Sequence, residues 1–333
     1  MALLEVKNLS IKFKKNGKYV PVVSNVSFTV NSGEILSLVG ESGCGKSASC
    51  LAITKLLPNN ATQITADSII FNAKELTTLK DKELRKVRGK GIAYIFQEPQ
   101  ASLNPVFKIG YQIEEILHLH RPEIIDTKAE VIDLLKQVGI PAPEKRINSY
   151  PHELSGGMQQ RVMIAMALAG NPALLIADEP TTALDVTIQA QILDLINQLR
   201  KKHNMGVILV THNLGIVAQS ADKVAVMYAG TIVETGKASE ILSNPSHPYT
   251  KALINAVPKL GTIDNKLSSI PGMVPTPEKF PIGCRFCGRC QLHNTLPPEI
   301  QELCKNQMPE LITNSQGTAI RCFGINKPEG SNE

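Results

Sequence analysis

The spacing of apolar and polar side chains changes several times along this chain, and each change predicts an element. Residues 4–13 alternate between the two kinds, and residues 19–30 do so again after Asn16 and Gly17. This period of two is typical of strands, and the Asn-Gly pair predicts a turn between them. Residues 34–39 are mainly apolar and lead into a glycine-rich segment, which favours a buried strand.

Farther along, strands and helices are predicted in alternation. Residues 46–57 have the spacing of a helix that stops at Pro58, and the stretch of about residues 99–160 is largely helical. Strands that alternate with helices predict an α/β fold with a mostly parallel sheet covered on both faces. The other predicted strands are 91–96, 174–178, 207–210 and 223–227, and the other predicted helices are 111–119, 128–138, 187–202 and 246–256.

The composition of the chain changes beyond Pro258, where prolines become frequent and the apolar side chains show little periodicity. We therefore predict a domain boundary near residue 260. Residues 1–260 are expected to form the main domain, with a helical subdomain at about 99–160. Residues 261–333 are expected to form a linker and a small cysteine-rich extension.

Composition excludes several classes of protein. The chain has 333 residues, of which 43% are hydrophobic and 20% charged, as in ordinary globular proteins. A net charge of +5 without a basic block argues against a nucleic-acid partner. No apolar run approaches the roughly 18 residues of a membrane-spanning helix. Glu5 interrupts the apolar N-terminus, which argues against a signal peptide, so we expect a cytoplasmic location.

A glycine-rich segment follows the predicted strand 34–39. Its glycines let consecutive backbone N–H groups and a helix N-terminus surround phosphate groups. Lys46 is expected to reach the β and γ phosphates of a nucleotide, and the Ser47 hydroxyl to bind Mg²⁺. The segment fits the pattern G-x-x-x-x-G-K-[ST] and reads Gly40, Glu41, Ser42, Gly43, Cys44, Gly45, Lys46, Ser47.

Two carboxylates end the apolar run 174–178. Asp178 is the last residue of that predicted strand, and Glu179 follows it. By itself, an Asp-Glu pair at the end of a strand is most often exposed to solvent and has no ligand. With a phosphate loop upstream, Asp178 is instead expected near Mg²⁺ at the carboxyl edge of the sheet.

Between these two motifs lies a segment that resembles the signature of the ATP-binding cassette (ABC) ATPases. The resemblance implies a phosphate-loop NTPase fold with a RecA-like core sheet, an antiparallel β-subdomain and a helical subdomain. A helix beginning near Met158 would point its positive end outward, toward the γ-phosphate of ATP held by another subunit. The alternative is an ordinary glycine helix cap without a ligand. The segment reads Leu154, Ser155, Gly156, Gly157, Met158, Gln159, Gln160, Arg161.

The resemblance also implies roles for single side chains. Glu179 would polarise the attacking water, Gln97 would sense Mg²⁺ and the transmembrane partner, and His212 would contact the γ-phosphate. A lone histidine at a strand end is usually a satisfied polar residue, so the role of His212 depends on the other motifs. Asp185 would communicate across a dimer of ATPases.

The adenine contact is the remaining expectation at the nucleotide site. Phe13 lies where the family places an aromatic ring that stacks on adenine. Tyr19 is the competing choice.

Four further segments resemble the peptide and nickel importer ATPases within this family, so that the likeness covers residues 3–323. Together they look like the D-type ATPase of a dipeptide or oligopeptide permease, which implies that this chain hydrolyses ATP to energise peptide uptake. The likeness also implies a different, homologous partner ATPase, two transmembrane permease subunits and an extracytoplasmic binding protein, with this chain at the cytoplasmic side of the membrane. A nickel importer, a non-transport ABC ATPase and a metal- or redox-sensing tail are the alternatives. The segments are 97–105, 247–253, 270–275 and 283–290.

Cysteines crowd the end of the chain. Cys44 and Cys50, near the phosphate loop, are expected to be structural. The others suit an iron–sulfur cluster or zinc, since both accept thiolate ligands. By resemblance, four of them bind a [4Fe–4S] cluster in some members of the subfamily. Five reduced thiols without a metal are the alternative. The four are Cys284, Cys290, Cys304 and Cys322, and Cys287 is an addition that is a spare or a substitute ligand.

Overall fold

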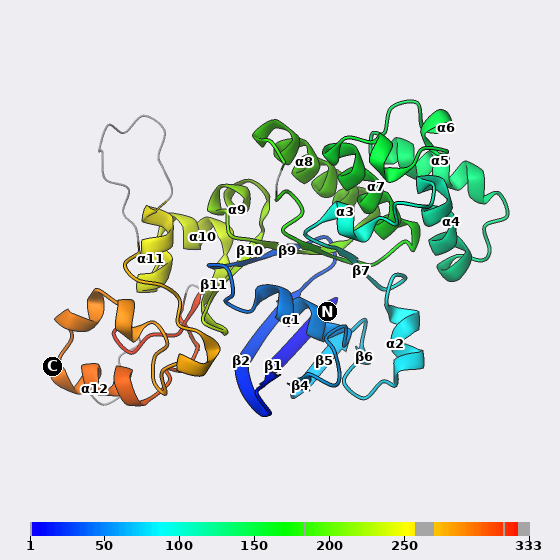
Figure 1. Ribbon diagram of the computed structural model, residues 1–333. Helices are drawn as coiled ribbons and strands as arrows, with labels where there is room; N and C mark the ends of the chain where they lie inside the picture. The colour runs from blue at the N-terminus through cyan, green and yellow to red at the C-terminus, as the bar shows by residue number, and fades with distance from the viewer. Residues whose placement is uncertain (1, 183, 257–269, 316, 326–333) are drawn as a thin grey trace. The chain divides into compact units, whose positions relative to one another are not determined.

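The computed structural model describes residues 2–182, 184–256, 270–315 and 317–325 (Figure 1). It divides into two compact units, which are described separately. The boundary predicted near residue 260 lies outside the described residues. Unit 1 comprises Met1–Leu4, Val30–Ile35 and Ile70–Val210, and unit 2 comprises Glu5–Thr29, Leu36–Ile69 and Thr211–Glu333.

Unit 1 contains a parallel arrangement of three strands. β8 (Leu174–Asp178) lies between β7 (Ile92–Ile95) and β9 (Gly206–Thr211), and it pairs in parallel with both. All side chains of β9 and the first four of β8 are buried. The continuous apolar runs of the sequence therefore correspond to strands that are covered on both faces.

Helices form most of the rest of unit 1. In Figure 1 the helices α4, α5, α6 and α7 gather in one cluster, and α7 packs against α3, α4 and α5. Most of these helices lie in the stretch of about residues 99–160 that was predicted to be helical, and α7 continues to Ala169. The helices are α2 (Asp81–Val87), α3 (Pro99–Ser102), α4 (Ile109–His120), α5 (Thr127–Gln137), α6 (Pro143–Arg146), α7 (Gly156–Ala169) and α8 (Val186–His203).

Unit 2 contains the strand that carries the phosphate loop. β3 (Ile35–Val39) is entirely buried and pairs in parallel with β10 (Lys223–Tyr228). β10 continues through the turn at Ala229 and Gly230 into antiparallel β11 (Thr231–Lys237). α1 (Lys46–Ile53) begins directly after the phosphate loop and is shorter than the predicted helix, because Thr54 ends it.

The alternating segments near the N-terminus form strands, as predicted. β1 (Leu4–Lys15) lies beside β2 (Lys18–Val30) and pairs with β4 (Thr62–Thr65). The turn between β1 and β2 contains Asn16 and Gly17, both with positive φ, as an Asn-Gly hairpin requires. The next strands are β5 (Ser68–Phe71) and β6 (Lys74–Glu75), which pair with each other. The pairings of β1 with β4 and of β5 with β6 are antiparallel, as the family resemblance implied.

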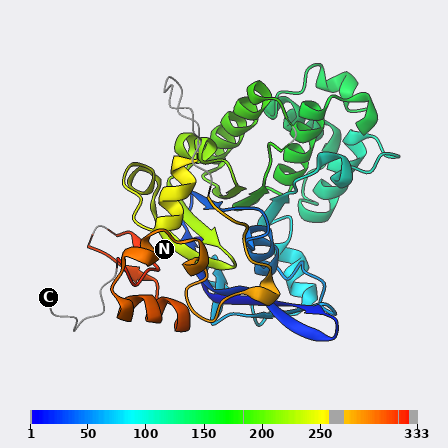
Figure 2. The same cartoon turned by 60° about the vertical axis from the view of Figure 1, so that its left-hand side comes forward.

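The C-terminal part of unit 2 is more regular than its proline content predicted. Residues beyond 310 add two short strands to the sheet that contains β11. β13 pairs with β11, and β12 pairs with β13. Figure 2 shows α11 in yellow next to the orange C-terminal segment. The elements are α9 (Leu214–Ser220), α10 (Ala238–Ser243), α11 (Pro248–Asn255), α12 (Pro298–Asn306), β12 (Ile312–Thr313) and β13 (Ala319–Ile320).

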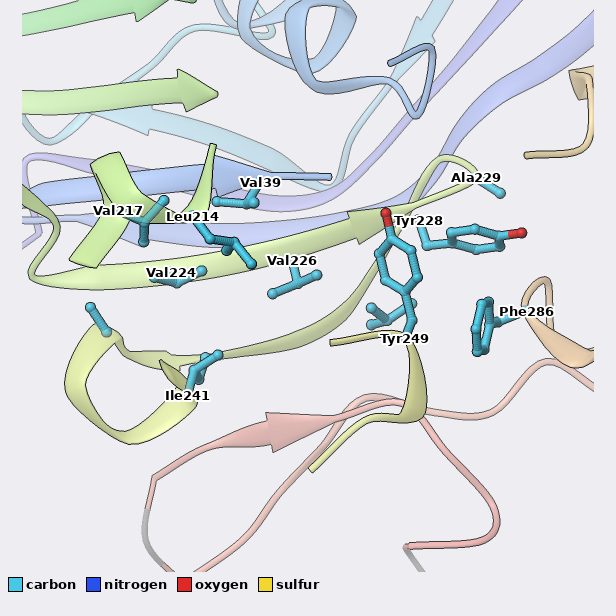
Figure 3. Close-up of a cluster of buried hydrophobic side chains, with 12 residues drawn as sticks. Val39, Leu214, Val217, Val224, Val226, Tyr228, Ala229, Ile241, Tyr249 and Phe286 are labelled. Carbon is cyan, nitrogen blue, oxygen red and sulfur yellow. The ribbon is translucent and has the colours of Figure 1, made fainter. Parts of the chain in front are cut away.

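A hydrophobic cluster joins the C-terminal segment to the core of unit 2. The rings of Tyr228, Tyr249 and Phe286 gather at one end of it, next to the aliphatic side chains of β10 and α9 (Figure 3). The ring centroids of Tyr228 and Tyr249 are 4.7 Å apart, and that of Phe286 lies 5.1 Å from Tyr228. Burial of these rings is what holds the cysteine-bearing segment in place.

Among the described residues, no helix is both long and apolar enough to span a membrane.

Candidate functional site: a nucleotide-binding loop and a catalytic carboxylate

The phosphate loop runs from the end of β3 to the start of α1. Lys46 is only 5% exposed, and its Nζ donates hydrogen bonds to the carbonyl oxygens of Gly40 and Glu41, at 2.8 and 3.1 Å. The ammonium group is thus held inside the curve of its own loop. Ser42, Gly43 and Ser47 are exposed there, where a phosphate group would reach them.

The glycines at two positions of the loop cannot be replaced without displacement. A Cβ at Gly40 would lie 2.1 Å from the backbone oxygen of Met227, and one at Gly45 would lie 2.8 Å from the Val23 side chain. Gly45 also has a φ of +102°, which side chains disfavour. The Cys44 carbonyl oxygen accepts a hydrogen bond of 2.9 Å from the N–H of Gly230. The loop is therefore packed against the β10–β11 turn.

Cys44 belongs to this loop but offers no reactive thiolate. It is 1% exposed, and burial raises the pKa of its thiol above the ordinary value, although nearby Lys46 acts in the opposite direction. A neutral, buried thiol packs as a small apolar side chain. Its backbone N–H remains part of the phosphate-binding segment.

Unit 1 brings together two of the three predicted catalytic side chains. Gln97, two residues beyond β7, donates from Nε2 to Oε2 of Glu179 at 3.2 Å, and Thr182 donates from Oγ1 to the same oxygen at 3.0 Å. Parallel pairing of β7 with β8 explains why residues 82 positions apart in sequence meet. Glu179 has a φ of +46°, an unfavourable region for a side chain of this type.

The signature segment forms the N-terminus of α7. That helix begins at Gly156, two residues before the predicted start at Met158, because Ser155 is its N-cap and accepts a 3.4 Å hydrogen bond from the Met158 N–H. Ser155 and Gly156 are exposed. A Cβ at Gly157 would meet the Ile188 side chain at 3.0 Å, so this glycine allows close packing on α8.

Asp185 has a local structural role in the described chain. It is the N-cap of α8, and its Oδ1 accepts a 2.9 Å hydrogen bond from the Ile188 N–H. Gln189 donates from its side-chain amide to the carbonyl oxygens of Thr181 and Leu184. The loop after Glu179 is therefore tied to the first turn of α8. The expected role across a dimer stays a prediction.

The structure places the remaining predicted nucleotide contacts on separate elements. Asp178 is the last residue of β8 and half-buried, and His212 is exposed just after β9. Phe13 is half-buried on β1, whereas Tyr19 on β2 is 47% exposed. The side chains of Ser47, Asp178 and Gln97 supply oxygen donors of the kind that Mg²⁺ prefers. Their roles toward Mg²⁺ and adenine stay predictions.

All five C-terminal cysteines line one small cavity, and all seven cysteines of the chain are free thiols. Burial, followed by the neighbouring thiols, raises the pKa of Cys284 to about 12 and that of Cys304 to about 11. Yet nowhere in the described ranges do three His, Cys, Asp or Glu side chains form a group that could hold a metal ion. This geometry does not support the expected [4Fe–4S] site at Cys284, Cys290, Cys304 and Cys322.

Two side chains that contact Glu41 of the phosphate loop, those of Tyr249 and Arg289, were not predicted as site residues. Glu41 donates its backbone N–H to the hydroxyl of Tyr249, at 3.0 Å, and its carboxylate accepts from the guanidinium of Arg289. Tyr249 and Arg289 lie in the segments 247–253 and 283–290, whose signal in the sequence is a family resemblance and not a site motif. The pattern G-x-x-x-x-G-K-[ST] leaves position 41 open.

Comparison with known proteins agrees with this site. The sequence profile of the ABC transporters matches residues 23–182, and the profile of the oligopeptide/dipeptide transporter C-terminal region matches residues 233–295. The first match spans the phosphate loop, the signature and Glu179. The protein is thus an ABC ATPase, an enzyme of the class that hydrolyses ATP.

The particular branch of the class follows from whole-length relatives. The dipeptide transport ATP-binding protein DppD of Escherichia coli is 46% identical over 97% of this chain and 96% of its own length. The oligopeptide transport ATP-binding proteins AppD and OppD of Bacillus subtilis are 44% and 52% identical, over 99% and 86% of this chain and 99% and 81% of their own lengths. The chain belongs to the family of peptide-transport ATP-binding proteins.

Solved structures confirm the cassette fold. A post-hydrolysis dimer of the ATP-binding cassette MJ0796, bound to ADP and phosphate, aligns with a TM-score of 0.63 and 28% identity over 71% of this chain and 98% of that chain. The ATPase CbiO1 of Clostridium perfringens, part of the CbiONQ transporter complex, aligns with a TM-score of 0.61 and 25% identity over 73% of this chain and 91% of that chain.

Proposed function

We propose that this protein is the ATP-hydrolysing subunit of an importer that takes up dipeptides or oligopeptides, at the cytoplasmic side of the cell membrane. The observation that carries the proposal is the Glu179 carboxylate held by Gln97 and Thr182, in a chain that also carries the oligopeptide/dipeptide transporter C-terminal region. The names of its whole-length relatives support a peptide as the transported substrate.

The mechanism assigns a separate task to each motif. The phosphate loop and Lys46 hold the β and γ phosphates through N–H groups and one positive charge. Ser47 and Asp178 would hold Mg²⁺, which neutralises charge that develops on the phosphates. Glu179 orients and deprotonates the attacking water, and Gln97 keeps the carboxylate turned toward that water. His212 would donate to the γ-phosphate.

A second ATPase subunit completes the site. Ser155, Gly156 and Gly157 present the positive end of α7, which suits a phosphate that belongs to another chain. A related cassette was solved as a dimer with ADP and phosphate. We propose that the partner is a homologous but different ATPase, and that a pair of permeases and an extracytoplasmic binding protein complete the importer.

A basic-rimmed apolar pocket in unit 1 suits a permease helix. It has a volume of about 590 Å³, and the side chains on α4 and α7 that line it are mainly apolar, while Arg85, Lys86 and Arg88 lie at its rim. Leu119 and Phe96 line it and are 72% and 44% exposed. We propose that an amphipathic helix on the cytoplasmic side of a permease docks here, with a carboxylate toward the basic rim.

The proposal also includes a metal, iron–sulfur or zinc, at the cysteine cavity. Its support is that five thiols line one cavity and that thiolates suit both iron–sulfur clusters and zinc. Anaerobic purification followed by iron, sulfide and zinc analysis tests it. About four iron and four sulfide per chain is the expected result for a [4Fe–4S] cluster, whereas metal-free protein would reject both metals.

Transport by the reconstituted importer tests the proposed function directly. The chain should co-purify with its permeases, and proteoliposomes that contain the complex and its binding protein should take up labelled dipeptide or oligopeptide only with ATP. Nickel uptake without peptide uptake would favour the nickel importers instead. ATP hydrolysis without any permease in the purified assembly would contradict a role in transport.

A further inference from the structure

The cysteine-bearing segment reaches the phosphate loop through one arginine. Arg289 lies in the helical turn Cys287–Arg289, between two cysteines, and its side chain is 9% exposed. Its Nη1 donates to both carboxylate oxygens of Glu41, at 3.3 and 3.1 Å. Its other nitrogens donate to the carbonyl oxygens of Ile270, Pro271 and Gly272. The guanidinium is therefore held by the phosphate loop on one side and by the backbone of residues 270–272 on the other.

Glu41 is held at a second point by α11. Its backbone N–H donates to the hydroxyl of Tyr249, whose side chain is fully buried. Tyr249 and Arg289 follow Glu41 by 208 and 248 residues in sequence. Two distant parts of the chain thus fix the main chain and the side chain of one residue in the phosphate loop. Charge-assisted hydrogen bonds that are shielded from water are the stronger kind.

Glu41 in turn contacts the lysine of the loop. Its carbonyl oxygen accepts a hydrogen bond of 3.1 Å from Lys46 Nζ, next to the 2.8 Å bond to Gly40. A continuous path therefore runs from Arg289 through Glu41 to the ammonium group of Lys46. Moving Glu41 would change the position of the loop carbonyl that holds this lysine.

A second arginine of the cysteine-bearing segment also contacts residues next to the phosphate loop. Arg285, four residues earlier in the segment, donates to the Ala229 carbonyl oxygen and, at 2.7 Å, to Ser24 Oγ. Ala229 precedes Gly230, whose N–H donates to the Cys44 carbonyl oxygen of the loop. The segment therefore supports the phosphate loop both at its start and at its middle.

We propose that Arg289 is a positioning residue for ATP binding, which keeps the phosphate loop and Lys46 arranged for the β and γ phosphates by holding Glu41. Arg289 does not itself touch the nucleotide in this scheme. The affinity for ATP then depends on the order of the segment around residues 284–290. The inference rests on the proposed phosphate contacts of Lys46 and goes beyond them by assigning control of the loop to the C-terminal segment.

Steady-state kinetics on the complex with the partner ATPase and the permeases, and equilibrium binding on the full-length chain, test this proposal. Arg289→Gln should raise the KM for ATP about tenfold, the effect of losing a charge-assisted hydrogen bond, and change kcat less than about twofold. The dissociation constant for MgATP, measured in a Glu179→Gln background without turnover, should rise in parallel. Arg289→Lys should restore part of the affinity. Lys279→Gln removes the same charge from an exposed position nearby and should change neither constant.

A double variant separates this path from a general loss of structure. Glu41→Gln alone should weaken MgATP binding as Arg289→Gln does, and the two together should be no worse than either one. Unchanged MgATP affinity in Arg289→Gln would overturn the proposal. So would additive effects, or a lowered melting temperature and kcat with an unchanged KM. If the wild-type complex with its partner ATPase failed to hydrolyse ATP, the proposed function would be refuted, and the binding constants of the chain would still decide the role of Arg289.

Discussion

At the carboxyl end of β8, one carboxylate has both an unusual backbone and two fixed neighbours. Glu179 has a φ of +46°, and its Oε2 accepts hydrogen bonds from Gln97 and Thr182. Backbone strain of this kind costs about 1–3 kcal/mol and persists where the surroundings impose it. Its position next to the predicted Mg²⁺ ligand Asp178 gives that strain a functional meaning.

Replacement of this carboxylate should separate ATP binding from hydrolysis. Glu179→Gln should reduce the rate of ATP hydrolysis about 10²- to 10⁴-fold, because an amide cannot take a proton from the attacking water. MgATP binding should persist, since the phosphate loop is unchanged. Phosphate release and equilibrium nucleotide binding measure the two effects. Glu115→Gln, an equivalent change at an exposed position of α4, should match wild type, and near-normal turnover in Glu179→Gln would refute the assigned role.

At the scale of elements, the phosphate loop tolerates a side chain at some of its glycine positions and not at others. Gly40→Ala would place a Cβ 2.1 Å from a backbone oxygen, whereas a Cβ at Gly43 would meet nothing within 4 Å. We expect Gly40→Ala to destabilise the protein by about 3 kcal/mol or more. Gly43→Ala should cost about 1 kcal/mol, for its positive φ alone. Thermal melting of the two variants measures the difference, and equal melting temperatures would contradict this account of the loop.

The pocket beside α4 yields a second prediction at this scale. Leu119→Asp places a charge in the apolar lining of the pocket and should abolish co-purification of the permeases. ATP binding by the isolated chain should persist, because the phosphate loop is not altered. Ile125→Asp is the matched control, since Ile125 is 99% exposed and does not line the pocket. Normal assembly with Leu119→Asp would show that the permeases dock elsewhere.

At the scale of the whole molecule, a few aromatic rings fasten the C-terminal segment to unit 2. Phe286 is 3% exposed and packs against Tyr228 and Tyr249. Truncation of a buried phenylalanine removes apolar contacts and leaves a cavity, at a cost of about 3–5 kcal/mol. Arg289 lies three residues after Phe286. Loss of the Phe286 ring should therefore also weaken the contact of Arg289 with Glu41 in the phosphate loop.

This coupling can be measured with one core substitution. Phe286→Ala should lower the melting temperature, expose the segment after residue 270 to limited proteolysis and weaken MgATP binding. Ile282→Ala, at a residue that is 88% exposed, should have none of these effects. Protease resistance and MgATP affinity equal to wild type in Phe286→Ala would show that the cluster does not anchor the segment.

Local signals made most of the fold predictable. Buried runs such as residues 174–178 and the alternating residues 4–13 became strands, since a strand's period is set by which faces it buries. Helix ends were less exact. α1 stops at Ile53 rather than Leu57, and α7 begins at Gly156 rather than near Met158. Ends depend on caps and on tertiary packing, which the apolar period does not record.

Candidate site residues were predictable where a motif fixes their chemistry at short range. Gly40, Lys46 and Glu179 were identified because their spacing and flanking strands have a physical meaning. The donors to Glu179 illustrate the limit: Gln97 was predicted as a site residue, but Thr182 was not. A threonine three residues downstream has no sequence signal that separates it from any other exposed threonine.

The amino-acid sequence by itself determined the class of this protein, because the phosphate loop, the signature and the acidic strand are local patterns whose backbone chemistry is carried by a few adjacent residues. It also indicated the alternation of strands and helices over residues 34–227. Only the tertiary structure decided that Arg289 and Tyr249 hold Glu41, and that the five C-terminal cysteines line one cavity without a formed metal group in the described residues. The contacts of Glu41 join residues more than 200 positions apart. Both arrangements depend on which surfaces pack together, information that no local period contains.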